Sequence, residues 1–403
     1  MKIVHISQYY NDGYGYQENI LPYYQALLGH EVVHITSDRM SAFVPLDKRI
    51  VGVKNYINNK VKIIRLPIKG EFKGRFVLFE GLYETLKKEK PDYIFHHNLT
   101  SPSLFTAVKY KRNYGTFLAV DNHSDINISG RNIFWRIGYY EFLWKSLLKG
   151  LYKDINVIFG VTPLRCEFPV KYLGAPENKV RLLPIGLDLR NIPPDSKSAL
   201  RQKYGFKDED VLIITGGKIT PEKKMSNILK AFNMLCEESS NIKLLIIGKI
   251  LDKDVENLSK LNNNIIYMGW KNRKETLEIL KMSDIAIWNT QHTTLIEDAL
   301  AAGNILILRY YGSTAHFIDN NGMYLFSNSV KEIYDKIKII VQNKGLMQKM
   351  SEETQKMINI LSYENIAKES IEYYYDLRPR YIHNYFMNDK FLDKNYGDYE
   401  KII

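Results

Sequence analysis

Cysteine is almost absent from this chain. Its 403 residues include only 2 cysteines, Cys166 and Cys236, which lie far apart in apolar, helical surroundings. A disulfide framework or a cysteine-based metal site needs more cysteines at closer spacing. We therefore expect two reduced, buried thiols, as is typical of a protein in a reducing compartment.

Long apolar runs are also missing. No stretch is long enough to cross a bilayer as a helix. The first residues, MKIVHIS, enter a strand-like pattern directly, without the apolar region and cleavage site of a secretory signal. We therefore expect a cytoplasmic protein. Its hydrophobic content of 45% and charged content of 25% are those of an ordinary globular protein.

Negative charge is in deficit. The 56 Lys and Arg residues outnumber the 45 Asp and Glu residues, and the formal net charge is +11. This balance favours nucleic acid, an anionic membrane surface or a phosphorylated substrate as a partner. Because no helix-turn-helix, zinc-finger or RNP pattern is recognisable, we do not expect nucleic acid.

Apolar runs alternate with amphipathic stretches along nearly the whole chain. Strands are predicted at 2–6, 31–36, 61–66, 93–95, 116–120, 157–161, 211–215, 243–247, 265–268, 285–288 and 305–308. Helices are predicted between them at 17–28, 78–88, 102–112, 223–236, 273–282 and 295–302. The alternation indicates an α/β protein with two doubly wound, Rossmann-like domains in succession.

A proline-rich break at residues 184–195 interrupts the alternation and predicts an interdomain linker. We expect an N-terminal domain over 1–190, a C-terminal domain over 191–362, and a final helix and tail over 363–403 that return to the first domain. In doubly wound sheets ligands bind beyond the carboxyl ends of the strands. The two domains are therefore expected to face each other across a cleft that holds the site.

Three segments combine residue types that bind phosphate or sugar. Gly13 and Gly15 follow the first strand, where they allow close backbone approach to a ligand or form a plain flexible turn. Lys218 and Lys223 follow a Gly-Gly pair before a helix, which fits either a pyrophosphate cradle or two solvated lysines. Glu297 lies in the first turn of a helix, where it either interacts favourably with the helix dipole or accepts hydrogen bonds from the hydroxyls of a ribose.

Known phosphate motifs do not match these segments. The Gly13 loop lacks the third glycine of a dinucleotide fingerprint, and the lysine segment lacks the P-loop spacing. Asp208 and Asp210 have D-x-D spacing, but they precede a strand on a solvated turn, and we exclude them as a metal site. We expect no metal and no cofactor if Lys218 and Lys223 form the pyrophosphate cradle, because the two lysines then neutralise the charge of the diphosphate.

Nine segments, in order, resemble landmarks of family 4 of the retaining GT-B glycosyltransferases. Singly they are not decisive, but together they are specific, and they span about residues 1–375. They are the first strand with its Gly loop, GHEVVHITSD (Gly29–Asp38), DNHSD with His123, PIGLD (Pro184–Asp188), GGKITPEKK (Gly216–Lys224), MGW (Met268–Trp270), SDIAIW (Ser283–Trp288), IEDALAAG (Ile296–Gly303) and LSYENIA (Leu361–Ala367).

The resemblance implies a GT-B fold in which the first domain binds the acceptor and the second a UDP- or GDP-sugar. Lys218 stands where the family usually has Arg, and both it and Lys223 would hold the donor diphosphate. Glu297 matches the second acid of the family's E-x7-E motif, which binds the ribose. Further donor-binding positions are Gly13, Gly15, Gly217, Trp270 beside the base, His292 and Thr293.

His123 matches a histidine that contacts the donor sugar or supports the leaving group. With Lys218 and Lys223, it makes up the catalytic set that the resemblance implies. The sequence departs from the family at Asn289, where the first acid of E-x7-E should stand. An amide keeps hydrogen bonding but brings no negative charge. We expect an altered donor there; reduced activity or an inactive homologue is the alternative.

The segment at residues 131–153 reads as one basic, aromatic amphipathic helix. At 100° per residue, basic side chains form one stripe and seven apolar side chains lie opposite. The apolar residues are Ile133, Ile137, Tyr140, Trp144, Leu147, Leu148 and Leu151. Such a helix either lies in an anionic membrane interface, which would place the protein on the inner face of the cell membrane, or packs on its own domain.

The expected function is a retaining, hexosyltransferase-type transfer from a nucleotide sugar to a glycan or lipid-linked acceptor, in cell-surface polysaccharide or glycoconjugate synthesis. A non-hydrolysing nucleotide-sugar 2-epimerase shares the two-domain architecture and needs no acceptor. A catalytically silent nucleotide-sugar-binding homologue in an assembly complex is the third hypothesis, for which Asn289 is the reason.

Overall fold

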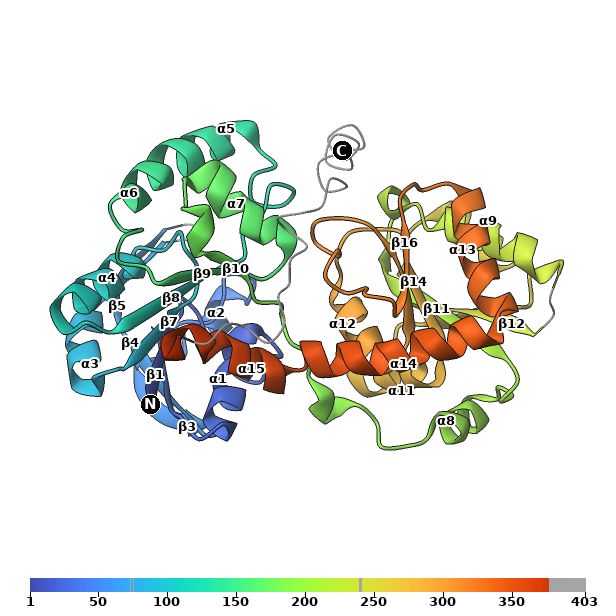
Figure 1. Ribbon diagram of the computed structural model, residues 1–403, viewed down its shortest axis with the longest axis horizontal. Helices are drawn as coiled ribbons and strands as arrows, with labels where there is room; N and C mark the ends of the chain where they lie inside the picture. The colour runs from blue at the N-terminus through green and yellow to red at the C-terminus, as the bar shows by residue number, and fades with distance from the viewer. Residues whose placement is uncertain (73, 75, 239–240, 377–403) are drawn as a thin grey trace. The chain divides into compact units, whose positions relative to one another are not determined.

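The computed structural model describes residues 1–376 apart from 73, 75 and 239–240 (Figure 1). It divides into two compact units. The first runs from Met1 to Gly186 and resumes at Tyr363, and the second is Leu187–Ser362. The first break thus lies four residues before the expected boundary at 190/191 and the second at the expected 362/363. The expected tail after residue 376 lies outside the described residues.

The first unit is built on an eight-stranded sheet with the order β10-β9-β8-β7-β1-β2-β4-β3, parallel except for the β3–β4 pair. Its strands are β1 (Lys2–Ile6), β2 (Glu31–Ser37), β3 (Lys54–Asn58), β4 (Val61–Leu66), β7 (Tyr93–His96), β8 (Phe117–Asn122), β9 (Val157–Gly160) and β10 (Val180–Leu182). Strands β5 (Ile68–Phe72) and β6 (Phe76–Phe79) form a separate antiparallel pair.

Helices cover both faces of this sheet. They are α1 (Gln17–Leu27), α2 (Leu46–Arg49), α3 (Leu82–Glu89), α4 (Ser103–Tyr114), α7 (Pro163–Leu173) and α15 (Tyr363–Glu372). Ile3 and Phe95 share one apolar cluster with Tyr363 of α15, and the alternate strand residues Val4 and Ile94 are also fully buried. Both faces are therefore covered, as a doubly wound sheet requires.

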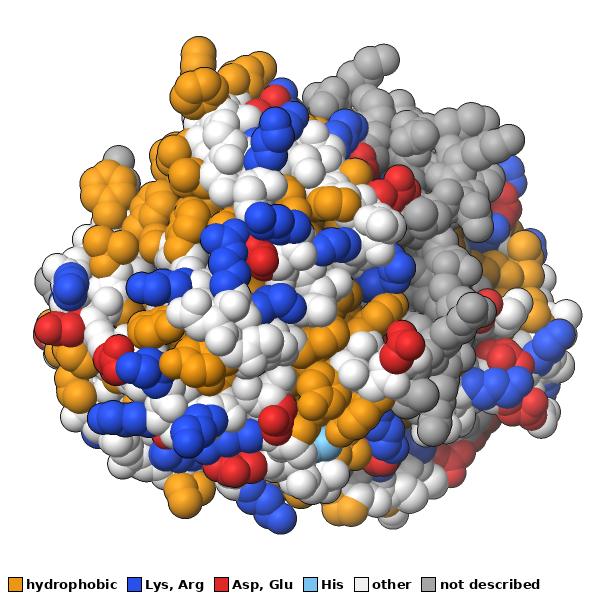
Figure 2. All heavy atoms as spheres, turned by 60° about the vertical axis from the view of Figure 1, so that its left-hand side comes forward, with side chains coloured by type: hydrophobic (Ala, Val, Ile, Leu, Met, Phe, Trp, Pro, Cys, Tyr) orange, Lys and Arg blue, Asp and Glu red, His pale blue; other side chains and the backbone are white. Residues whose placement is uncertain are grey.

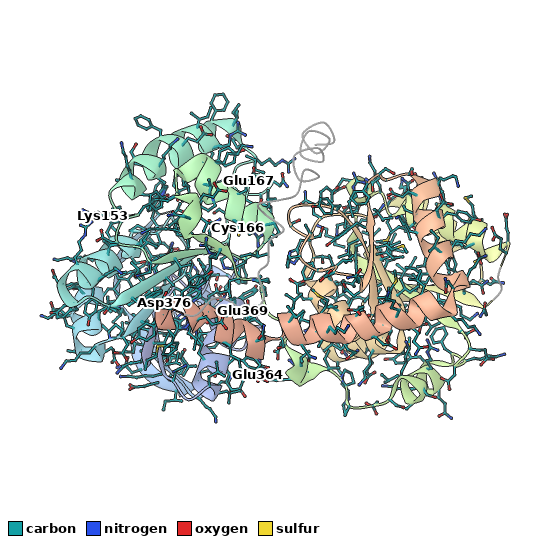
Figure 3. All side chains as sticks on the ribbon, viewed as in Figure 1. Lys153, Cys166, Glu167, Glu364, Glu369 and Asp376 are labelled. Carbon is teal, nitrogen blue, oxygen red and sulfur yellow. The ribbon has the colours of Figure 1, made fainter. Side chains whose placement is uncertain are left out.

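Helix α15 returns to the first unit through specific contacts. Tyr363 stacks on Tyr24 of α1 with ring centroids 5.8 Å apart. The Tyr93 hydroxyl donates to the Ser370 carbonyl at 2.6 Å, and the Gln25 amide donates to the Ser370 hydroxyl at 2.9 Å. Figure 3 labels Glu364 and Glu369 on this helix. The C-terminal helix thus completes the N-terminal core.

The segment at 131–153 is not the single α-helix that the sequence predicted. It consists of α5 (Ile133–Trp135), a π-helix η1 (Arg136–Trp144) and α6 (Lys145–Lys149). A π-helix has more residues per turn than the α-helix on which the spacing of 100° per residue is based. Consequently Ile133, Ile137 and Leu147 are exposed, whereas Tyr139, which the stripe omitted, is buried.

The second unit is a six-stranded, wholly parallel sheet with the order β13-β12-β11-β14-β15-β16. Its strands are β11 (Val211–Ile219), β12 (Ile242–Ile250), β13 (Ile265–Gly269), β14 (Ile285–Trp288), β15 (Ile305–Arg309) and β16 (Gly322–Leu325). Its helices are α8 (Lys197–Tyr204), α9 (Ser226–Cys236), α10 (Lys253–Ser259), α11 (Arg273–Met282), α12 (Thr294–Ala301), α13 (Val330–Gln342) and α14 (Lys344–Leu361). Two apolar clusters lie on opposite faces, one around Ile214 and one around Ile213. The predicted fold class of two Rossmann-like units is confirmed.

Strand β11 is longer than predicted, because it continues through Gly216 and Gly217 to Ile219. Gly216 pairs with Ile247 and Gly217 with Gly248 of β12. A Cβ on Gly248 would collide with the Gly217 carbonyl oxygen, and both residues have φ above +100°. Glycine at both positions therefore lets the two strands continue side by side past the end of the apolar core.

The two cysteines are free thiols. Cys166 on α7 is buried, as expected, and burial raises its pKa to about 12 (Figure 3). Cys236 is only half-buried, which corrects the expectation for that residue. Within residues 1–376, apart from the three gaps named above, no helix is long and apolar enough to cross a membrane.

Candidate functional site

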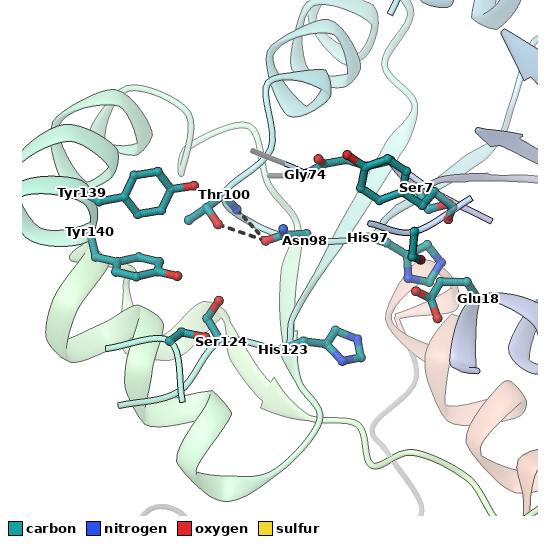
Figure 4. Close-up of a pocket in the computed structure, with 14 residues that line it drawn as sticks. Ser7, Glu18, Gly74, His97, Asn98, Thr100, His123, Ser124, Tyr139 and Tyr140 are labelled. Carbon is teal, nitrogen blue, oxygen red and sulfur yellow. Dashed lines mark hydrogen bonds between the residues drawn. The ribbon is translucent and has the colours of Figure 1, made fainter. Parts of the chain in front are cut away.

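A polar pocket of about 370 Å³ opens in the first unit (Figure 4). Its walls come from the carboxyl ends of three neighbouring parallel strands, β1, β7 and β8, together with α1 and η1. The lining residues are Ser7, Gln8, Tyr9, Glu18, Ser41, Gly74, His97, Asn98, Thr100, His123, Ser124, Ser129, Tyr139 and Tyr140. Hydroxyls, amides and two imidazoles dominate this lining, which suits a ligand rich in hydroxyl groups.

His123, predicted from the sequence, lines this pocket with a side chain that is 38% exposed. Its Nε2 lies 3.3 Å from Oδ2 of Asp121, a fully buried carboxylate. The same oxygen lies 2.7 Å from Nδ1 of His97, and the other Asp121 oxygen accepts from the Asn98 backbone. Asp121 thus fixes the orientation of both imidazoles in the pocket wall.

The charges of this cluster follow from its contacts. Burial opposes ionisation of Asp121, but His97 and His123 lower its pKa well below the usual range. Burial likewise disfavours the charged form of His97, and Asp121 overcomes this and raises its pKa. Burial, with a further contribution from His97, lowers the pKa of His5 to about 3. The arrangement is an ion pair of Asp121 and His97 next to a neutral His5.

These protonation states define a continuous chain of hydrogen bonds. Protonated His97 donates from Nε2 to Nδ1 of His5 over 3.0 Å, and Nε2 of His5 donates to the Gln25 carbonyl oxygen over 2.6 Å. Gln25 in turn donates to Ser370 on α15. The sequence analysis missed His97 and Asp121, although both follow predicted strands and Asp121 stands in the same DNHSD segment as His123.

Gly13 and Gly15 lie exposed in the turn before α1, in the same unit. Gly13 has φ +80°, and a Cβ there would meet nothing within 4 Å. Glycine is therefore required at Gly13 by backbone conformation, and it leaves open space above the turn. Neither glycine belongs to the residues that line the pocket.

In the second unit the predicted donor residues gather at the carboxyl ends of adjacent strands β11 and β14. Lys218 is exposed at the end of β11, and Lys223 is half-buried in the turn Pro221–Lys223 that follows. A Cβ on Gly217 would lie 3.9 Å from Nζ of Lys223 and 3.7 Å from Leu295 of α12. The glycine thus marks the point where the lysine turn and the start of α12 meet.

Lys223 is prepared to accept an anion. Burial lowers the pKa of its ammonium group, Glu222 opposes this shift, and the charge of Lys218 adds to it. A cation that is partly desolvated beside a like charge gains more from an anionic ligand than a solvated one does. The charges of Lys218 and Lys223 thus interact, and the cradle that they would form stays a prediction.

Glu297 lies in the first turn of α12 with one oxygen engaged and one free. Nε2 of His292 lies 2.6 Å from its Oε1, and the His292 ring stacks on Phe317 at 5.8 Å. Oε2 is buried and has no hydrogen-bond partner among the described residues. A buried carboxylate oxygen without a partner is costly, so this atom is suited to a hydroxyl donor from a ligand. Thr293 precedes the helix as its N-cap residue.

Asn289 has a structural partner. It is 3% exposed, and its amide donates to the Lys224 carbonyl over 3.0 Å. Lys224 has φ +48°, so this bond holds the lysine turn in a conformation that L-residues seldom adopt. A glutamate at this position would place an acceptor against an acceptor. Asn289, where the resemblance implies an acid, therefore holds the lysine turn in place.

Trp270 and Arg309 complete the residues at this sheet edge. Trp270 follows the edge strand β13 and is 77% exposed, two strands away from β11. Arg309, which the sequence analysis missed, ends β15 beside β14 and is 4% exposed. Its Nε and Nη1 find no hydrogen-bond partner among the described residues. The sequence did not indicate a role for Arg309, because a single arginine at the end of an apolar strand matches no binding motif.

No group of three or more His, Cys, Asp or Glu residues that could hold a metal ion occurs in the described part of the chain. The expectation of a reaction without metal stays a prediction.

Comparison with known proteins places this geometry in a class. Two chains of known structure share the fold: a glycosyltransferase from Rickettsia africae (TM-score 0.64, 16% identity, 96% of this chain and 99% of that one) and Anabaena HepE in complex with UDP and glucose (TM-score 0.60, 12% identity, 94% and 100%). Together with the two parallel-sheet units, they define a GT-B fold. Residues 196–357 match the family "Glycosyl transferases group 1". The second unit is a glycosyltransferase group 1 domain.

Curated relatives include the alpha-monoglucosyldiacylglycerol synthases of Streptococcus pneumoniae and Acholeplasma laidlawii. The first is 25% identical over 252 residues and the second 23% identical over 215 residues. These alignments cover 58% and 50% of this chain. The chain spans little more than half of each relative's length, 54% in both cases.

Proposed function

We propose that the protein is a hexosyltransferase-type glycosyltransferase that moves a sugar from a UDP- or GDP-sugar to a glycan or lipid-linked acceptor with retention. The observation that carries this proposal is the match of residues 196–357 to the group 1 family, in a unit where Lys218, Lys223 and Glu297 follow the adjacent strands β11 and β14 at their carboxyl ends. The fold neighbour that was solved with UDP and glucose supports the choice of donor class.

The donor is held through its diphosphate and its ribose. Lys218 and Lys223 bind the diphosphate, since two ammonium groups at the end of β11 attract a dianion. Glu297 accepts one ribose hydroxyl at Oε2, because His292 occupies Oε1. Trp270 offers an exposed indole face to the base. Asn289 supports the site indirectly by holding the lysine turn.

Catalysis rests on positioning and on stabilisation of the leaving diphosphate. The charge that develops on the departing phosphate is neutralised by Lys218 and Lys223. The polar pocket of the first unit holds the acceptor, with its hydroxyl and amide groups as partners for sugar hydroxyls. His123, oriented by Asp121, contacts the reacting sugar or supports the leaving group.

We propose that the acceptor is an intermediate of cell-surface polysaccharide or glycoconjugate synthesis. The relatives named above are glucosyldiacylglycerol synthases, and a further relative, 22% identical, is a lipopolysaccharide 1,2-N-acetylglucosaminetransferase of Salmonella typhimurium. By name, these three relatives act in glycolipid or lipopolysaccharide synthesis, which supports a role of this kind. An assignment to family 4 agrees with the nine landmarks of the sequence.

Titration calorimetry with UDP, GDP and their glucose and mannose conjugates tests the donor assignment. Binding of one diphosphate series, followed by nucleotide release only when an acceptor extract is added, is the expected result. Epimerisation of the donor without an acceptor would instead establish the 2-epimerase. Tight donor binding with no nucleotide release under any acceptor would establish the silent homologue.

A further inference from the structure

An unusual apolar surface lies on the outer side of the helical segment 131–153. We call it the η1 face. Six of its apolar side chains are between 40% and 85% exposed. They are Ile133, Phe134, Ile137, Phe142, Leu143 and Leu147. Contiguous exposed apolar groups of this size on one segment mark an interaction site in most proteins.

The fold does not need this face. Tyr140, Trp144 and Leu148, on the inner side of the same segment, are at most 3% exposed. Trp144 stacks on Phe76 of β6, and Tyr140 contacts Phe168 of α7 at 5.0 Å. The segment therefore has two apolar sides, of which only one anchors it to the first unit. The outer side is available for a partner.

The segment that carries the η1 face is also positively charged. Arg131, Lys145, Lys149 and Lys153 are all exposed. The one acidic residue of the segment, Glu141, lies 3.4 Å from Arg136. Five basic residues against one acidic residue give the segment a charge of +4. In Figure 2, Lys and Arg side chains lie among hydrophobic ones over the face of this unit turned to the viewer.

The inner side of the same segment borders the polar pocket. Tyr139 and Tyr140 of η1 form one wall of that pocket, opposite Glu18 and His97 in Figure 4. Tyr139 also contacts Phe76, which follows Gly74 of the pocket wall. A single helical segment thus links a cavity suited to hydroxyl groups with a surface suited to hydrocarbon.

A second exposed aromatic cluster lies beside the pocket. Tyr14, Tyr16 and Phe43 contact one another with ring centroids 5.5–6.3 Å apart and are 41–62% exposed. They flank two residues of the pocket lining, Glu18 and Ser41. Exposed tyrosines are typical of the interface between lipid headgroups and water.

We propose that the η1 face docks the first unit on an anionic lipid bilayer and that the pocket receives the polar headgroup of an amphiphilic acceptor lying in that bilayer. The statement about the acceptor rests on the proposed function; the statement about docking does not. A bilayer offers phosphates to the four basic residues and hydrocarbon to the apolar side chains at one surface. A protein partner would have to alternate acidic and apolar groups at the same spacing.

Charge reversal tests the electrostatic part. The full chain is sedimented with vesicles of phosphatidylglycerol and phosphatidylcholine and with vesicles of phosphatidylcholine alone. Each basic residue near an anionic surface changes partition by about fivefold. Replacing Lys145, Lys149 and Lys153 by Glu should therefore lower binding to the anionic vesicles by at least about a hundredfold, because loss of the three positive charges alone has that effect. The matched control, Glu at three exposed lysines of the second unit, Lys230, Lys253 and Lys274, should change it little.

Insertion of the apolar side chains is tested separately. A polarity-sensitive dye on Phe134→Cys, in a Cys236→Ser background, should shift to shorter wavelength on anionic vesicles and be quenched by spin-labelled acyl chains. The same dye on Leu261→Cys, an exposed site of the second unit, should do neither. Phe134→Ser with Phe142→Ser should weaken binding about as strongly as charge reversal, whereas Leu261→Ser with Ile339→Ser should not.

The outcomes separate docking from the proposed function. Donor binding without vesicles should be unchanged in every η1-face variant, because these residues lie in the other unit from Lys223 and Glu297. Equal partition to anionic and neutral vesicles, or none to either, overturns the docking proposal. So does self-association that light scattering detects and that Phe134→Ser abolishes. Docking without sugar transfer to any membrane acceptor would leave the surface in place and overturn the acceptor assignment.

Discussion

At the scale of single residues, the ammonium group of Lys223 lies 3.9 Å from where a Cβ on Gly217 would be, and Lys218 adds a second charge. Lys223→Ala and Lys218→Ala should each weaken binding of the nucleoside diphosphate by about 1–3 kcal/mol, since each removes a charge-assisted contact. Affinity for the nucleoside alone should stay nearly the same. Calorimetry with both ligands measures this, with Lys230→Ala as the control. Unchanged diphosphate affinity in both variants would remove the cradle from the donor site.

Glu297 offers one oxygen, which makes its role testable hydroxyl by hydroxyl. Glu297→Gln should raise the Kd of the donor nucleotide about tenfold through loss of a hydrogen bond to a charged group. The 2′-deoxy and 3′-deoxy forms of the nucleotide should then behave differently. For the nucleotide that lacks the hydroxyl bound by Oε2, Glu297→Gln should weaken binding no further. For the other deoxy nucleotide, the loss from Glu297→Gln and the loss from the missing hydroxyl should add. Additive effects for both would show that Oε2 faces neither hydroxyl.

The buried histidines of the first unit predict how its stability depends on pH. Burial lowers the pKa of His5 and of His96 to about 3, with His97 contributing to both shifts. Between pH 6.5 and about 3, only the unfolded chain takes up protons at these two sites, so stability falls as the pH drops. His97, with a raised pKa, contributes in the opposite sense: its stabilisation is complete below pH 6.5 and is lost as the pH rises through its folded pKa.

Urea unfolding at several pH values measures this slope. His96→Asn should reduce it by about 1.4 kcal/mol per pH unit, the contribution of one proton. A slope that is identical in the variant would mean that His96 takes up its proton in the folded state.

The sequence showed His123, because it matches a family landmark. It did not show His97 or Asp121, because their importance lies in a contact across neighbouring strands.

At the scale of elements, the contact between Gly217 and Gly248 keeps β11 and β12 paired up to the start of the lysine turn. Gly248→Ala should destabilise the second unit by about 3 kcal/mol or more, since the new Cβ meets the Gly217 carbonyl oxygen at φ +107°. Gly138→Ala is the matched control, because a Cβ there meets nothing within 4 Å. It should leave stability unchanged or raise it by about 0.5–1 kcal/mol. Thermal unfolding followed by circular dichroism compares the two, and equal effects would contradict the close approach.

Elements were predictable where an apolar run carried the signal. The central strands such as β1, β4 and β14 coincide with the predicted ranges, since each is buried on both faces. The edge strand β3 was missed because its side chains alternate between exposed and half-buried positions. The π-helix η1 was missed because a change of helical pitch leaves no mark in composition. Because of that single change, Ile137 is exposed although the expected apolar stripe also contains the buried residues Tyr140 and Trp144.

At the scale of the whole molecule, the first unit depends on a helix that the chain reaches only after completing the second. Ile366 of α15 is fully buried in the core shared with Ile3 and Phe95. A domain of this size has a net stability of about 5–15 kcal/mol. A carboxylate at position 366 would lose about 2 kcal/mol of apolar burial and add the larger cost of a buried charge.

Ile366→Asp should therefore unfold the first unit at a lower temperature while the second unit keeps its own transition. Differential scanning calorimetry should show two separated transitions, and the later one should still rise when the nucleoside diphosphate that the protein binds, UDP or GDP, is added, because binding stabilises the folded state by mass action. Glu364→Ala, at an exposed position of the same helix, should leave both transitions in place. Loss of nucleotide binding together with the first unit would mean that the group 1 domain does not fold independently of α15.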